Sequence, residues 1–296
     1  MIDDITLKKC QNIQLGLLKD FDRVCRENNW TYWLDGGTLL GAVRHKGFIP
    51  WDDDIDVVMP RKDFEAFARG GQACLDAAIF LQTIETDCFN ESFCIKLRDR
   101  NSTLIEESDK DTRVSYHQGI FIDIFPADVI KRQSVKKIFC LFKLFRRISW
   151  LKRFIYIPAG SMKRRKARGK IAVALFFPIA CIIRIFLKDE YIYVKTLEQK
   201  KISLYKTCWS AADDGVYFFP FLCIYFPHKV FDKHDLFPLT NVLFEHEYFP
   251  APFDPDIYLR RQYGDYMKLP PPDKRESHSY AILPDTPCNH PESFKK

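Results

Sequence analysis

Apolar and polar residues recur along the chain with two different periods, which separate predicted helices from predicted strands. From Leu7 to Asn28 the apolar residues return every three or four positions, the spacing of one buried helix face. From Asp54 to Met59 carboxylate and aliphatic side chains alternate, so Asp54 and Asp56 share one face of a strand. Shorter runs predict further strands at 32–34, 80–86, 93–97, 103–106, 119–125 and 218–226, an arm of a hairpin at 243–249, and helices at 38–43, 61–68, 190–206 and 257–263.

The stretch from Tyr32 to Met59 combines two features that are typical of catalytic sites. Gly36 and Gly37 follow a short apolar run, and paired glycines let backbone amides approach a bound group closely. Asp54 and Asp56 then converge on one spot, where like charges repel unless a carboxyl is protonated or a cation binds. A small number of hard oxygen ligands favours Mg²⁺ or Mn²⁺. These ions usually complete their coordination with water and substrate phosphate oxygens, so the pair predicts phosphoryl chemistry. The alternative without a function is a solvated acidic turn.

A third carboxylate lies inside the apolar run 119–125, where Asp123 is flanked by isoleucines. Burying a single charge is costly unless a metal or an arginine compensates it. Asp123 is therefore a candidate partner of the acidic pair, and Asp52 and Asp53 are candidate outer ligands. We expect Pro126 to end the strand that carries Asp123.

Basic residues near the acidic strand supply a second part of a phosphate site. Arg44, His45 and Lys46 lie between the glycine pair and the carboxylates. Guanidinium and ammonium groups suit phosphate oxygens, so Arg44 and Lys46 are predicted to hold substrate phosphates, unless they only balance the acids. Lys96 and Arg98 share one face of their strand, which either lines the cleft or is an exposed edge.

These motifs resemble the signature of the nucleotidyltransferase fold superfamily. Gly36-Gly37-Thr38 followed by Asp54-Ile55-Asp56 is similar to its glycine motif and its paired-carboxylate motif. The longer string from Asp35 to Asp56 is similar to the LicD family, whose relatives include fukutin and fukutin-related protein. The resemblance extends to residues 122–126, 263–266 and 270–272, so it covers both ends of the chain and skips the middle.

The resemblance implies a fold and a set of residue roles. The implied fold is α/β (α+β), a nucleotidyltransferase-type mixed, curved β-sheet flanked by helices, with a basic, apolar helical insertion. A carboxylate on a later strand completes the superfamily triad, which makes Asp54, Asp56 and Asp123 the catalytic and metal-binding residues, with Asp52 as a further candidate ligand of Mg²⁺ or Mn²⁺. The implied nucleotide- and phosphate-binding set is Gly36, Gly37, Thr38, Arg44 and Lys46.

The same resemblance implies an activity. It is metal-dependent transfer of a phospho-substituent, with phosphocholine preferred, from a CDP-linked donor to a glycan hydroxyl with release of CMP. Such transfer modifies a cell-surface polysaccharide or glycolipid, as in lipopolysaccharide biosynthesis. Three alternatives stay open: transfer of phosphoribitol or phosphoglycerol, nucleotidyl transfer by attack on the α-phosphate of a nucleoside triphosphate, and a non-catalytic membrane or glycan adaptor that retains the fold.

Charge is sharply segregated along the 296 residues. The net charge is +6, yet residues 131–188 hold 17 Lys and Arg and no Asp or Glu, which leaves a balance of −11 elsewhere. In that segment the apolar run 171–187 is interrupted by Pro178 and Arg184, so it is too short to predict a membrane span. Basic helices with an apolar face are typical of interfacial segments attracted to anionic lipid, and packing on the catalytic core is the alternative.

The predicted organisation has three parts: a catalytic core at 1–130, a basic helical insertion at 131–206, and a C-terminal part at 207–296 that completes the catalytic domain. In the insertion the candidates for facing a membrane are Lys163, Arg164, Arg165 and Lys166. No helix-turn-helix, RNA-recognition or zinc pattern supports a nucleic-acid partner.

The remaining sequence features concern location. The chain starts with the acidic stretch Met1–Asp4, which does not resemble a secretory signal, and its ten cysteines are scattered as expected for reduced thiols. We therefore expect a cytoplasmic protein, peripheral on the cytosolic face of a membrane, with a glycan or a lipid-linked glycan as acceptor. The seven histidines are too dispersed to predict a metal set, and His278 has no assigned role.

Overall fold

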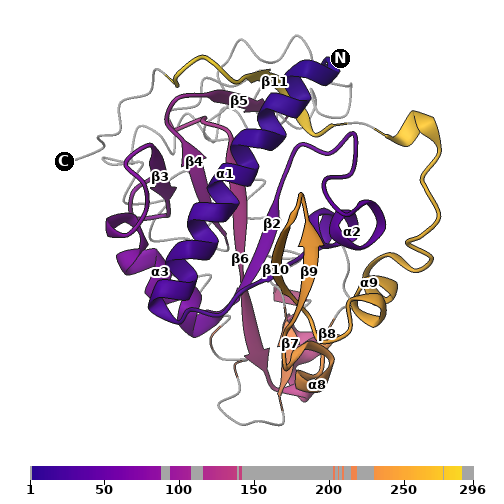
Figure 1. The fold of residues 1–296 in the computed structure, drawn as a ribbon. Coiled ribbons are helices and arrows are strands. Elements are labelled where there is room, and N and C mark those ends of the chain that lie inside the picture. Colours follow the sequence, from indigo (N-terminus) through magenta and orange to yellow (C-terminus); the bar gives the residue numbers. More distant parts are fainter. Residues whose placement is uncertain are drawn as a thin grey trace, which may run out of the picture.

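A mixed β-sheet with helices packed against it forms the centre of the fold, which confirms the predicted α/β class (Figure 1). The computed structural model describes residues 2–87, 94–107, 116–138, 140–141, 215–218, 230–275 and 277–288, together with residues 203, 206 and 209. The predicted helix at 190–206 and most of the basic insertion, including Lys163 to Lys166, lie outside the described residues. Within the ranges given above, no helix has the length and apolar character needed to cross a bilayer.

The sheet has the strand order β1-β2-β6-β4-β3, and β7 and β8 continue it from the far half of β6. Strands β2 and β6 are parallel, and the other neighbouring pairs are antiparallel. The strand bounds are Trp33–Leu34 (β1), Asp56–Pro60 (β2), Ile79–Gln82 (β3), Ile95–Asp99 (β4), Phe121–Ile130 (β6), Val216–Phe218 (β7) and Val230–Phe231 (β8).

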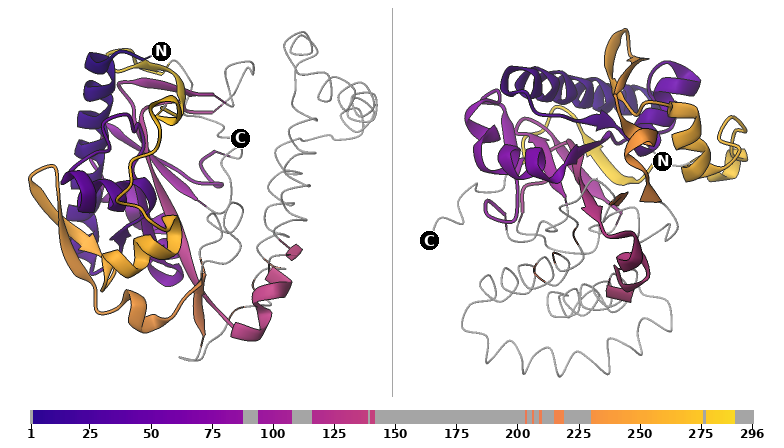
Figure 2. Two further views of the ribbon diagram at one scale, coloured as in Figure 1. Left: turned by 90° about the vertical axis from the view of Figure 1, so that its right-hand side faces the viewer. Right: turned by 90° about the horizontal axis from the view of Figure 1, so that it is seen from below.

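Two helices cover the apolar face of this sheet. Helix α1 (Asp4–Asn28) and helix α3 (Arg61–Gly70) pack against β6 and its neighbours, as both views of Figure 2 show for α1. Phe21 from α1 and Phe67 from α3 are fully buried with their rings 5.2 Å apart. The side chains that alternate with the carboxylates, such as Val57 and Ile122, join the same core. The opposite face of the strands therefore carries the polar positions.

A second group of elements lies beside β1 and β2. It contains α2 (Gly36–His45), α8 (Lys233–Leu236), α9 (Pro255–Tyr263) and the hairpin of β9 (Thr240–Phe244) with β10 (Glu247–Ala251). Buried Asp35, just before α2, accepts hydrogen bonds from the Tyr258 hydroxyl at 2.6 Å and the Gln262 amide at 2.8 Å. These bonds fix α9 against the start of α2.

The C-terminal segment returns to the start of the chain. Strand β11 (Ser279–Leu283) pairs with β5 (Thr103–Glu106), and both lie near the N-terminal end of α1 (Figure 1). The sequence pattern did not predict β11. Three single-turn 3₁₀ helices, at Gly71–Ala73, Arg132–Ser134 and Pro272–Lys274, complete the described elements.

Several predicted boundaries were wrong. The strand predicted at 80–86 ends at Gln82, where a turn follows. Strand β6 continues through Pro126 to Ile130, because pairing with β4 ends at Ile124 and pairing with β7 starts at Asp128, so the missing N–H of Pro126 faces neither strand. The predicted hairpin arm at 243–249 instead contains the turn of the β9–β10 hairpin, where Glu245 and His246 both have positive φ.

Candidate active site

A row of polar side chains crosses the face of the sheet that α1 and α3 leave free. Asp56 on β2 is the register partner of Asp123 on β6, Asp123 is the partner of Lys96 on β4, and Lys96 is the partner of Gln82 on β3. Register partners point to the same side of a sheet, so the four side chains form one line across four strands. The predicted meeting of Asp56 and Asp123 thus follows from parallel pairing of β2 with β6.

Three carboxylates at one end of this row have no basic partner. Asp52, Asp54 and Asp56 are partly buried, and none forms an ion pair with a lysine or arginine that the structure describes. Burial and the carboxylates around it raise the pKa of Asp54 to about 6, opposed by His278. Burial, then Asp54 and Asp123, raise the pKa of Asp56 well above its usual range. Burial and Asp54 do the same for the pKa of Asp52. Among the described residues, no lysine or arginine therefore compensates these three charges.

Other buried acids nearby have named partners, and the contrast sets the cluster apart. Asp128 forms a two-point ion pair with Arg61, with N–O distances of 2.7 and 2.8 Å. Asp53, a predicted outer ligand, accepts the backbone N–H groups of His278 and Ser279, each at 2.8 Å. Both Asp53 oxygens thus anchor the C-terminal segment, and the role of Asp53 as an outer ligand stays a prediction.

Asp123 has a lysine where the sequence predicted a metal or an arginine. The Lys96 ammonium lies 2.9 Å from one Asp123 oxygen and 3.1 Å from the other, and 3.7 Å from Glu106. Burial raises the pKa of Asp123, and Lys96 opposes the rise. Burial lowers the pKa of Lys96, but Asp123 and Glu106 outweigh this and the pKa is raised. Lys96 therefore stays charged beside Asp123. Strand β4 lies between β6 and β3, so Lys96 is on a central strand and not at an exposed edge.

The glycine pair makes room for two of the carboxylates. Gly36 and Gly37 are the first residues of α2, not a loop before it, and Gly36 has φ +53°. A Cβ on Gly36 would lie 2.6 Å from an Asp56 oxygen, and one on Gly37 would lie 2.7 Å from an Asp52 oxygen. The acids thus lie against the N-terminal turn of α2, where the helix dipole favours negative charge. Thr38 is buried, and its hydroxyl oxygen accepts the Asp56 backbone N–H at 2.8 Å.

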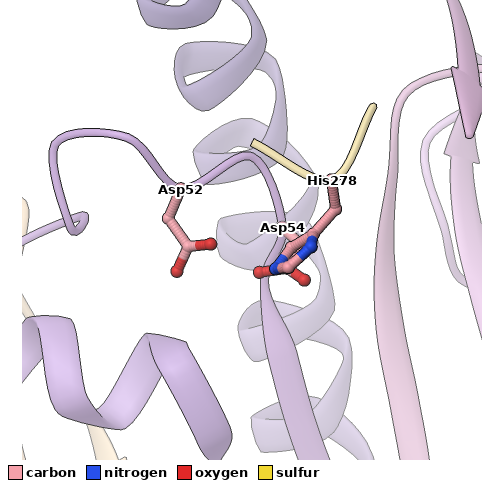
Figure 3. Close-up of side chains that lie close together, drawn as sticks. All are labelled: Asp52, Asp54 and His278. Atoms are coloured by element: carbon pink, nitrogen blue, oxygen red, sulfur yellow. The ribbon is translucent and has the colours of Figure 1, made fainter. Parts of the chain in front are cut away.

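His278 joins the cluster from the C-terminal segment (Figure 3). A side-chain nitrogen of His278 and carboxylate oxygens of Asp52 and Asp54 all lie within 4.8 Å of one another, a spacing that could hold a metal ion. The sequence assigned His278 no role, because 224 residues separate it from Asp54 and long-range contacts bring it back. These contacts are the Asp53 hydrogen bonds to His278 and Ser279 and the pairing of β11 with β5.

A similar trio, Asp232, His234 and Asp235, is already neutralised. Asp232 and Asp235 form the capping box of α8, Asp232 pairs with Arg132, and Asp235 pairs with Arg261 through both oxygens. These carboxylates have basic partners, whereas Asp52, Asp54 and Asp56 have none in the part of the chain that the structure describes. We therefore regard the Asp232 trio as a structural feature of α8.

The two predicted phosphate-binding cations occupy different positions. Arg44 donates a hydrogen bond from Nη1 to the Tyr266 carbonyl at 2.7 Å, which places the segment 263–266 beside the site. Burial and then Arg275 lower the pKa of Arg44, and Asp52 opposes them. Lys46 is exposed at the C-cap of α2, about 15 Å along the helix axis from Gly36. The structure thus groups Arg44 with the acids and leaves Lys46 at the far end of α2.

The donor set fits a hard divalent cation. Asp52, Asp54, Asp56 and the neighbouring Asp123 offer carboxylate oxygens, with one imidazole from His278. Carboxylate oxygens suit Mg²⁺ and Mn²⁺, and Mn²⁺ also accepts imidazole. A paired-carboxylate strand beside a parallel strand with a further carboxylate, closed by a glycine-started helix, defines a nucleotidyltransferase-type site.

Comparisons with known proteins agree with this class. Residues 29–167 match the family described as LicD/FKTN/FKRP, nucleotidyltransferase domain. The chain is 30% identical over 289 residues to the lipopolysaccharide cholinephosphotransferase LicD of Haemophilus influenzae, which covers 93% of this chain and 96% of that protein. The chain therefore belongs to the LicD family, which confirms the resemblance seen in its motifs.

Two shorter matches accompany it. A 26-residue stretch, 9% of this chain and 5% of the relative, is 65% identical to the human ribitol 5-phosphate transferase FKRP. A 47-residue stretch, 16% of this chain and 18% of the relative, is 51% identical to an uncharacterised protein of Rickettsia prowazekii.

Proposed function

We propose that the protein is a metal-dependent phosphotransferase that moves phosphocholine from a CDP-linked donor to a glycan hydroxyl and releases CMP. The observation that carries the proposal is the set of three carboxylates without a basic partner in the part of the chain that the structure describes, with raised pKa values at Asp52, Asp54 and Asp56. The similarity to a lipopolysaccharide cholinephosphotransferase over nearly the whole of both chains supports phosphocholine and a glycan acceptor.

In this proposal Asp54 and Asp56 hold the cation, with Asp52 and Asp123 as flanking ligands. Mg²⁺ or Mn²⁺, when bound there, would supply positive charge that stabilises the negative charge developing on the donor phosphate during in-line displacement. The backbone amides of the first turn of α2 face the same region and are suited to phosphate oxygens. Gly36 and Gly37 have no side chain that would prevent such an approach.

Lys96 and Asp123 have a separate part in the proposal. Since Lys96 keeps Asp123 charged and fixed at the centre of the polar row, Asp123 is placed to accept the proton of the acceptor hydroxyl or to complete the ligand set of Asp56. Lys96 is thus a positioning residue, because its ammonium contacts Asp123 and Glu106.

The acceptor and its location are extensions of the same proposal. An acceptor linked to lipid at the cytosolic face of a membrane agrees with the basic segment 131–188 of the sequence, which suits an anionic surface. Flotation with anionic vesicles measures this directly, and no binding at low salt would remove the membrane from the proposal.

A donor screen tests the activity. The protein is incubated with Mg²⁺, a glycolipid extract and one of CDP-choline, CDP-ribitol, CDP-glycerol or CTP, and CMP and pyrophosphate are measured. We expect CMP from CDP-choline, and none from Asp54→Asn or Asp56→Asn at matched concentrations. If only CDP-ribitol yields CMP, the transferred group is phosphoribitol and not phosphocholine. The FKRP match makes phosphoribitol the second candidate. If only CTP reacts and pyrophosphate is released, the activity is nucleotidyl transfer and not phosphotransfer. If no donor yields a product, the non-catalytic adaptor is the remaining hypothesis.

A further inference from the structure

Arg275 lies near α2 although 231 residues separate it from Arg44 in the sequence. Its guanidinium lies 5.1 Å from the centre of the Trp51 ring, and the Trp51 ring lies 6.4 Å from the ring of His45 at the end of α2. Trp51 is followed directly by Asp52. Arg275 is therefore held at the edge of the acidic cluster, on the same side as the last turn of α2.

Each arginine is held in place by one backbone carbonyl. Arg44 donates from Nη1 to the Tyr266 carbonyl at 2.7 Å, and Arg275 donates from Nε to the Pro270 carbonyl at 2.9 Å. The two acceptors are four residues apart on the segment that leads from α9 to β11. A guanidinium has five N–H donors, so both arginines keep most of theirs for another acceptor.

Neither guanidinium forms an ion pair with any carboxylate that the structure describes. Other arginines of this part of the chain have such pairs, for example Arg61 with Asp128 and Arg261 with Asp235. Two neighbouring cations without an anion repel each other, and the effect of Arg275 on the pKa of Arg44 has this sign. The two guanidinium groups thus mirror the acidic cluster, because neither has a described partner of opposite charge.

We propose that Arg44 and Arg275 form an anion subsite that binds the diphosphate of a nucleoside diphosphate donor, directly beside the carboxylates. The inference rests on the proposed function and adds Arg275, which no sequence motif indicated. Two guanidinium groups offer paired N–H donors to phosphate oxygens, and the Trp51 ring keeps Arg275 oriented. Asp52 directly follows Trp51 and opposes the lowering of the Arg44 pKa, so the proposed subsite adjoins the acidic cluster.

Arg275→Ala tests the subsite, and Lys274→Ala is its matched control. Lys274 is the exposed neighbour, so its removal takes away the same charge without the Trp51 and Pro270 contacts. Isothermal titration with CDP, with pyrophosphate and with cytidine, each in the presence of Mg²⁺, gives the affinities. Arg275→Lys keeps the charge but loses the paired donors, and thermal unfolding establishes that each variant is folded.

We expect Arg275→Ala to weaken CDP and pyrophosphate by about 10- to 100-fold, Arg275→Lys to weaken them by about 10-fold, and Lys274→Ala to change them by less than about twofold. Cytidine affinity should not change. Equal CDP affinity in folded Arg275→Ala and Lys274→Ala would overturn the subsite while leaving the proposed function standing. Pyrophosphate binding that depends on Arg275, in a protein that binds no CDP, would support the anion subsite and overturn the CDP-linked donor.

Discussion

Asp54→Asn should make the metal-free protein more stable, although it removes a residue that we place at the centre of the site. Asp54 lies among Asp52, Asp53 and Asp123 without a lysine or arginine partner in the part of the chain that the structure describes, and its pKa is raised from 3.8 to about 6. An ionised Asp54 therefore destabilises the folded state. Burial is the largest cause of that rise in pKa, and neighbouring carboxylates add to it. Asparagine has nearly the same shape and carries no charge, so the cost of burying a charge and the repulsion are both lost and the packing is kept.

The size of the effect follows from the pKa shift. A difference of about 2 pKa units corresponds to about 3 kcal/mol, at 1.36 kcal/mol per unit. Asp54 is partly exposed, so solvent screens part of the repulsion and about 3 kcal/mol is an upper limit. At about 2 °C per kcal/mol for a chain of this size, Asp54→Asn should raise the unfolding temperature by up to about 6 °C.

The effect also has a defined pH dependence. Between the ordinary pKa of 3.8 and the folded pKa of about 6, the folded protein holds a proton on Asp54 that the unfolded chain has lost. The stability of the wild type therefore falls as the pH rises through this range, and the loss is complete above it. The advantage of Asp54→Asn should be full at neutral pH and should disappear below the unfolded pKa of 3.8, where Asp54 is protonated in the folded and the unfolded state alike.

Thermal unfolding in EDTA and in Mg²⁺ provides the assay. Saturating Mg²⁺ should raise the unfolding temperature of the wild type, by about 2.7 kcal/mol of stability at a hundredfold excess over its dissociation constant, and should not change that of Asp54→Asn. Asp128→Asn is the control, because the same chemical change there removes the charge of a buried carboxylate that forms a two-point ion pair with Arg61, and it should cost about 3 to 5 kcal/mol. An Asp54→Asn protein that is less stable than wild type in EDTA at neutral pH, or that shows the same Mg²⁺ shift, would refute the reasoning.

Two further substitutions test the surroundings of the carboxylates. Gly36→Ala should lower the free energy of unfolding by about 1 to 2 kcal/mol, because the residue has φ +53°, and it should displace Asp56 and weaken Mg²⁺ binding in a titration. The control is Gly16→Ala inside α1, which has open space around it and should be neutral or stabilising. Normal Mg²⁺ affinity in Gly36→Ala would contradict the packing argument. His278→Ala should weaken Mn²⁺ binding by about 10-fold and Mg²⁺ binding much less, because imidazole suits Mn²⁺. Electron paramagnetic resonance measures the Mn²⁺ affinity, and the fold should be kept because Asp53 holds only the backbone of His278. An equal loss in His234→Ala, or no loss in either variant, would remove His278 from the ligand set.

The local parts of the fold could be predicted because short-range patterns specify them. The period of two from Asp54 to Met59 placed Asp54 and Asp56 on one face, and the spacing of apolar residues predicted α1 to within three residues at its start. Asn29, which adopts the left-handed conformation at the C-cap, ends α1 where the sequence predicted. These features depend on residues at most a few positions apart.

The site could be predicted only in part, because its remaining contacts join distant segments. The pairing of Asp123 with Lys96 depends on the register of β4 against β6, which no local pattern of either strand specifies. His278 and Arg275 reach the site through the Asp53 hydrogen bonds and the Trp51 contact. The available signal was Asp53, an additional aspartate directly before Asp54. The structure shows that it is buried and accepts the backbone N–H groups of the C-terminal segment.

The polar row itself indicates why the acids are left without a cation. At Asp123 the chain provides a lysine on the next strand, so the fold is able to neutralise a carboxylate at this depth. One strand further, Asp56 and its neighbour Asp54 receive no such partner among the described residues, and burial raises the pKa of both. A lysine beside Asp56 would oppose that rise, but it would compete with the divalent ion of the proposed function. We therefore propose that Lys96 fixes Asp123, whereas Asp54 and Asp56 are kept for a ligand.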